Sequence, residues 1–72
     1  EKSNMYKGNI WVEALASKYE AEIKVAKATL QVYFKNSVGI GEHSDLVEEF
    51  DKHIEALASA EEKLETLRRN FT

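Results

Sequence analysis

Residues 44–71 read SDLVEEFDKHIEALASAEEKLETLRRNF, and the spacing of the apolar residues in this stretch decides the fold. Alternating steps of four and three pick out one series, in which His53 is the polar member: Leu46, Phe50, His53, Leu57, Ala60, Leu64, Leu67 and Phe71. Because this spacing keeps returning to the same side of an α-helix, it predicts one long helix with an apolar seam. Such a seam needs a second helix to pack against.

The second helix is predicted upstream, over about residues 10–37, where apolar residues again recur at helical spacing. Asn9 is a suitable N-cap for this helix, and Gly39 followed by Ile40 indicates a left-handed stop. The apolar residues form one broad stripe, made of Trp11, Val12, Leu15, Ala16, Tyr19, Ile23, Ala26, Leu30, Tyr33 and Phe34.

A link of about six residues leads into the helix over about residues 45–70, and so short a link forces the two helices to run antiparallel. Pairing residues whose numbers sum to about 80 places Ile23 near Leu57 and Trp11 near Leu67. The sequence therefore predicts an all-α fold, an antiparallel two-helix hairpin that forms one domain over residues 9–72. Residues 1–8 lack periodicity and are expected to be a flexible segment, of which residues 1–4, before Met5, are either native or an expression scar.

Composition narrows the class of protein. The 72 residues are 43% hydrophobic and 32% charged, with a net charge of −3 and no Cys, so disulfides and Cys-ligated zinc are excluded. No apolar run approaches the ~20 residues that a membrane span needs, and we expect no membrane partner. The acidic balance argues against the basic face of nonspecific nucleic-acid binding. We expect a cytoplasmic protein.

One hairpin leaves too much apolar surface uncovered, because the stripe on the first helix is broader than one neighbouring helix can cover. In addition, Ala14, Ala21 and Ala28 recur every seven residues, with Val25 and Val32 between them. This spacing is either a matter of helix propensity or a second helix–helix contact. We expect two hairpins to pair as a homodimer, a four-helix bundle; a different partner helix and a monomer with an exposed stripe are the alternatives. The interface candidates are Trp11, Ala14, Tyr19, Ala21, Val25, Ala28, Val32, His53, Ala60 and Leu67.

Candidate chemical groups are few. His53 follows Glu49 by one helical turn, and with Glu61 it is a conceivable metal ligand, but bundle metal sites use Glu-x-x-His motifs and none occurs here. We interpret His53 as a residue at the edge of the seam and His43 as a solvated loop residue. We expect no catalytic residue, no metal and no cofactor, and hence no enzyme.

The strings VGIGEH at residues 38–43, after YFKN at residues 33–36, and AEEKLE at residues 60–65 resemble small uncharacterised proteins of tailed bacteriophages, including phages of marine cyanobacteria. The resemblance covers most of the chain from Asn9 onward. It implies no catalytic residue, and it implies the cytoplasm of an infected bacterium as the setting.

The sequence thus favours a non-enzymatic helical module that associates with itself and serves interaction or assembly. One alternative is a nucleic-acid-associated accessory protein with a Lys ridge on the first helix, interrupted by Glu13 and Glu20. The ridge residues are Lys18, Lys24, Lys27 and Lys35. The other alternative is a metal-binding bundle that uses His53, Glu49 and Glu61.

Overall fold

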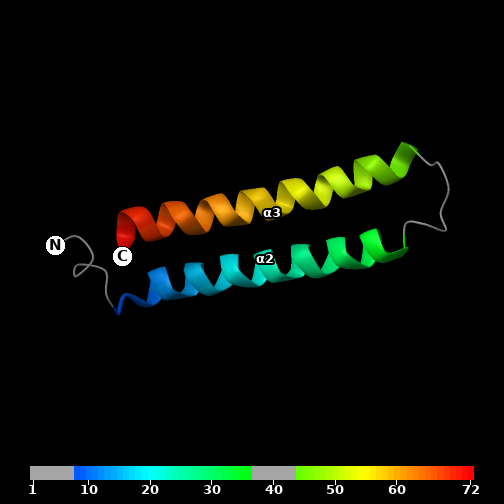
Figure 1. The fold of residues 1–72 in the computed structure, drawn as a ribbon. Helices are drawn as coiled ribbons and strands as arrows, with labels where there is room; N and C mark the ends of the chain where they lie inside the picture. The colour runs from blue at the N-terminus through cyan, green and yellow to red at the C-terminus, as the bar shows by residue number, and fades with distance from the viewer. Residues whose placement is uncertain (1–7, 37–43) are drawn as a thin grey trace.

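The computed structural model describes residues 8–36 and 44–72, which form two α-helices, α2 (Ile10–Asn36) and α3 (Ser44–Phe71). The helices lie side by side along their length and run in opposite directions (Figure 1). Within the described ranges there is no strand. The predicted all-α, two-helix hairpin is confirmed, with helix bounds that differ from the prediction by one residue.

Asn9 is the N-cap of α2, as predicted. Its side-chain Oδ1 accepts hydrogen bonds from the backbone N–H groups of Trp11 (2.9 Å) and Val12 (3.3 Å). Its carbonyl oxygen accepts the first helical bond, from the N–H of Glu13, at 3.1 Å. Two of the otherwise unsatisfied N–H groups of the first turn are therefore bonded by one side chain. The predicted stop at Gly39 and Ile40 lies outside the described residues.

The two helices meet along a narrow inner seam. On α3 the seam follows the predicted series, and Ala60, Leu64 and Leu67 are buried. On α2 the same alternation of four and three gives the seam residues, of which Ala26 and Leu30 are buried and the others half-buried: Val12, Ala16, Tyr19, Ile23, Ala26, Leu30 and Tyr33. One neighbouring helix covers only this stripe, so the outer members of the predicted broad stripe stay exposed, with Trp11 at 76% and Phe34 at 57%.

The register differs from the predicted one. The contacts Tyr33–Phe50, Phe34–Phe50, Tyr33–His53 and Glu20–Arg68 join residues whose numbers sum to between 83 and 88 rather than to 80. Side chains lean toward the N-terminus of their own helix, which in an antiparallel pair moves the contacts by about two positions. Trp11 precedes Val12, the first seam residue of α2, and is 76% exposed.

Candidate interaction surface

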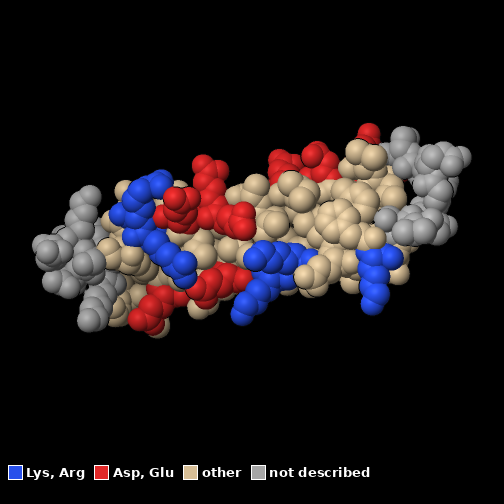
Figure 2. All heavy atoms as spheres, in the orientation of Figure 1, with Lys and Arg blue, Asp and Glu red and all other residues tan. Residues whose placement is uncertain are grey.

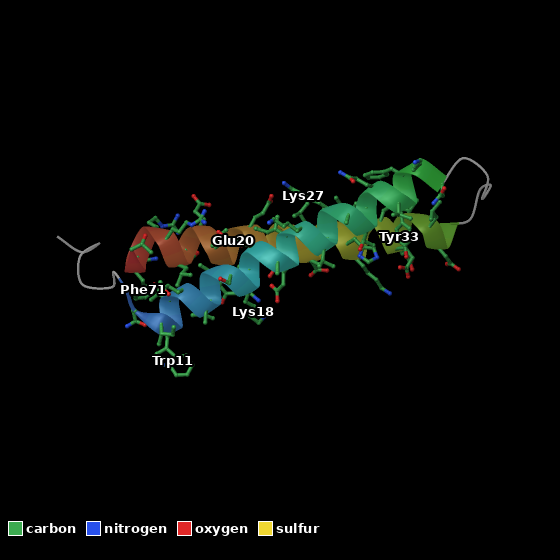
Figure 3. The ribbon with its side chains drawn as sticks, turned by 90° about the horizontal axis from the view of Figure 1, so that it is seen from below. Trp11, Lys18, Glu20, Lys27, Tyr33 and Phe71 are labelled. Carbon is green, nitrogen blue, oxygen red and sulfur yellow. The ribbon has the colours of Figure 1, made fainter. Side chains whose placement is uncertain are left out.

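The two long edges of the hairpin differ in character. Seen from the side of α2, Glu20 and Lys27 project from one edge and Trp11 and Lys18 from the other (Figure 3). On the Glu20 edge, the carboxylate of Glu20 accepts a hydrogen bond from the guanidinium of Arg68 at 2.6 Å, which ties the helices together across the seam. Acidic and basic side chains cover much of this charged edge near the chain ends (Figure 2).

The Lys18 edge carries a second heptad series on α2, which we call the outer stripe. All of its members are exposed, and three are large apolar residues: Trp11 at 76%, Val25 at 64% and Val32 at 55%. The outer stripe consists of Trp11, Ala14, Lys18, Ala21, Val25, Ala28 and Val32. Its steps alternate between three and four, so it has the spacing of a helix–helix seam without a neighbouring helix in one chain.

An open groove of about 520 Å³ runs beside the outer stripe, between α2 and α3. Its floor is made of small side chains, which leave the groove shallow and mostly apolar: Ala21, Ala26, Thr29, Ala56, Ser59 and Ala60. Glu22, Val25, His53 and Lys63 complete the lining. A floor of small residues allows another helix to approach closely.

The charge of Lys18, in the outer stripe, is paired within the chain. The ammonium of Lys18 donates a hydrogen bond to the carboxylate of Glu22, one turn away, at 2.5 Å. This hydrogen bond raises the pKa of Lys18 above its ordinary value and lowers the pKa of Glu22 below its own. Both side chains are exposed, so water screens the pair and its contribution to stability is small.

His53 lies where the groove meets the seam. Its Nε2 is 3.8 Å from Oε1 of Glu49, and its ring meets the ring of Tyr33 at a centroid distance of 5.1 Å. The side chain is 29% exposed. Among residues 8–36 and 44–72, no group of three or more His, Asp or Glu side chains is placed to hold a metal ion. His43 lies outside the described residues.

The predicted interface candidates separate into three groups. Ala60 and Leu67 are buried in the seam of a single hairpin, so contacts within one chain already cover them. Tyr19 and His53 are half-buried. The remaining candidates are exposed and belong to the outer stripe: Trp11, Ala14, Ala21, Val25, Ala28 and Val32.

The predicted Lys ridge is divided between two sides of α2. Lys18 and Lys27 project from opposite edges (Figure 3), because nine residues correspond to two and a half helical turns. Lys18 is also paired with Glu22, and Glu20, beside Lys24 and Lys27, is paired with Arg68. The nucleic-acid alternative stays a prediction, with three rather than four lysines on one side.

Sequence reasoning missed an apolar patch near the start of α3. Phe34 stacks on Phe50 at a centroid distance of 4.8 Å, and Val47 (70%) and Ile54 (46%) are exposed. The seven-residue spacing of Val47 and Ile54 is the signal that could have revealed it. In Figure 2 this end of the hairpin shows a largely uncharged area between acidic groups on α3 and basic groups on α2.

Comparison of the chain with protein-family models, curated proteins and solved structures gives no match. Neither α2 nor α3 combines the length and the apolar character that crossing a membrane requires.

Proposed function

We propose that the protein is a non-enzymatic interaction module that works as a homodimer, in which two hairpins assemble four helices. The exposed outer stripe carries this proposal. The inner seam accounts for most of the hydrophobic pattern of α3, apart from Val47 and Ile54, whereas α2 has a whole second series at heptad spacing that one chain leaves in solvent.

The exposed apolar side chains of α2 support association. Trp11, Val25 and Val32 of the outer stripe are 76%, 64% and 55% exposed. Burying apolar surface against a partner is favourable by about 25 cal/mol per Å². A second hairpin that covers the outer stripe would therefore stabilise the assembly.

The small core supports the same conclusion. In the described part of the chain the buried hydrophobic residues are Ala26, Leu30, Ala60, Leu64 and Leu67. Two of these are alanines, and no side chain of the described residues is more than 98% buried. Chains of this size bury a modest share of their surface on folding and gain stability from a partner.

A role without catalysis fits the distribution of polar groups. No polar or charged side chain among the described residues is buried, so none sits in the water-excluded setting that shifts pKa values in active sites. The charged groups around the groove are Glu22, His53 and Lys63, and the first of these is already paired with Lys18.

The test is the molar mass of the full chain in solution, by size exclusion with light scattering. We expect twice the 8.2 kDa of the chain at micromolar concentration, and a melting temperature that rises with protein concentration because dimerisation is linked to folding. A monomeric mass together with a melting temperature independent of concentration would overturn the proposal.

A further inference from the structure

We infer that the occupant of the outer stripe is a second copy of the same stripe, packed antiparallel, with Ala21 of both molecules near the twofold axis. This inference rests on the proposed function and specifies its interface. In the resulting assembly the two α2 helices form the inner pair and each α3 lies on the outside, still packed along its own inner seam.

The order of residue sizes in the outer stripe reads the same in both directions. Large and small side chains alternate as Trp, Ala, Lys, Ala, Val, Ala and Val, with Ala21 in the middle. In a twofold antiparallel contact centred on Ala21, alanine therefore meets alanine and a large residue meets a large residue, and the alanines allow a close approach at the centre. The residues that face each other across the axis are Trp11 and Val32, Ala14 and Ala28, and Lys18 and Val25.

The antiparallel pairing covers the most exposed apolar residues at both ends of the stripe. With Ala21 near the axis, Ala14 lies opposite Ala28 of the second copy. Because alanine side chains are small, the distance between the two helix axes can fall to the lower end of the usual ~8–10 Å. Trp11, 76% exposed in one chain, then lies beside Val32 of the second copy. Both ends of the contact are equivalent, so each dimer covers two Trp–Val pairs.

Electrostatics favour this edge over the opposite one. Lys18 is the charged member of the outer stripe, and its hydrogen bond to Glu22 balances it before association. On the charged edge, a second hairpin would have to desolvate Glu20, Arg68 and the neighbouring acidic groups, which costs free energy.

The experiment uses single cysteines in the full chain, which has no native Cys. Ala21→Cys tests the axis, Ala58→Cys is an exposed control on α3, and Ser59→Cys lies in the groove and tests a bundle in which the groove faces meet. Residues on the axis of closely packed helices come within the Cα separation of 4.4–6.8 Å that a disulfide needs. After mild oxidation we expect a covalent dimer for Ala21→Cys, at least about 10-fold more than for Ala58→Cys or Ser59→Cys.

A second pair of variants tests the same interface without cross-linking. Ala21→Glu places two unpaired carboxylates on the axis, and we expect the dissociation constant of the dimer to rise at least about 100-fold. Ala58→Glu adds the same charge at an exposed position of α3, and we expect it to change the dissociation constant of the dimer less than about 3-fold. Circular dichroism at 222 nm checks that the helices persist in both variants.

The outcomes separate the interface from the function. If the wild-type chain is dimeric but Ser59→Cys cross-links in place of Ala21→Cys, or Ala21→Glu stays dimeric, the proposed interface is wrong and the dimeric module stands. A monomeric wild-type chain removes both. A dimer that Ala21→Cys captures and Ala21→Glu dissociates supports both.

Discussion

Glu20 and Arg68, 48 residues apart in sequence, meet at 2.6 Å and join the two helices across the charged edge of the hairpin. The pair lies between the N-terminal half of α2 and the last turn of α3. It therefore joins the helices at the end of the hairpin where α2 begins and α3 ends.

Separating Glu20 from Arg68 should cost little stability. The two side chains are 48% and 56% exposed, so a double-mutant cycle with Glu20→Gln and Arg68→Gln should give a coupling free energy of about 0.2–1 kcal/mol, which falls as salt is added. The matched cycle on Glu65 and Arg69, an exposed pair within α3 at 3.5 Å, should give a smaller coupling free energy. A coupling free energy well above 1 kcal/mol, or one that added salt does not reduce, would contradict the description of an exposed pair.

Leu64 should be one of the most sensitive positions of the fold. It is 8% exposed in the inner seam, and Leu64→Ala should lower the free energy of unfolding by about 2–5 kcal/mol. Val47→Ala, at a position that is 70% exposed, should lower it by less than about 1 kcal/mol. Denaturant unfolding at one fixed protein concentration measures both, and equal effects would show that the seam is not the core.

The start of α2, the antiparallel direction of the two helices and the seam of α3 were all predictable from the sequence, because each depends on residues close in sequence. Asn9 caps its own helix, and the α3 seam needs only the heptad series. The register of α2 against α3 was not predictable, because it depends on how side chains such as Tyr33 and Phe50 pack against each other between the two helices.

The sequence also does not show which partner each apolar helix face contacts. Heptad spacing shows that Ala60 and Leu67 face a helix, but it does not say whether that helix is α2 or a second chain. The structure buries both within one hairpin. Likewise the broad apolar stripe of α2 did not reveal that Trp11 stays largely exposed, or that Phe34 stays 57% exposed while it stacks on Phe50 of α3.

The Lys18–Glu22 pair should make a small, pH-dependent contribution to stability. The lowered pKa of Glu22 means that its contribution is present above the ordinary value of 4.5 and is lost as the pH falls through the folded-state pKa. The raised pKa of Lys18 means that its contribution is present below 10.5 and is lost as the pH rises through the folded-state pKa. The melting temperature of Glu22→Gln should therefore lie slightly below that of the wild type at pH 7 and match it at pH 3. Glu62→Gln, an exposed change of the same charge, serves as control, and a difference that persists at pH 3 would point to another cause.

Trp11 should report association directly, because it is the single Trp of the chain and is 76% exposed in one molecule. Its fluorescence emission should shift to shorter wavelength as protein concentration rises through the dissociation constant, since Val32 of the second copy would exclude water from the indole. The same titration of Ala21→Glu should leave the emission at the wavelength of an exposed indole. If the emission wavelength of the wild type stays constant at concentrations where scattering shows a dimer, Trp11 lies outside the interface.

The uncharged patch near the start of α3 provides a contrasting position. Ile54→Asp changes an exposed residue of this patch on α3, outside the outer stripe of α2, and should leave the dimer dissociation constant within about 3-fold of the wild-type value. A much larger effect than that of Ala21→Glu would move the interface to this patch.

Sedimentation equilibrium of the wild-type chain and Ala21→Glu, run together over the micromolar range, is the most direct test of association through the outer stripe. We predict that the wild type fits twice the 8.2 kDa of the chain and that Ala21→Glu fits the single-chain mass with its helices intact. A wild-type chain that sediments as a monomer throughout this range, or two proteins that sediment alike as dimers, would contradict it.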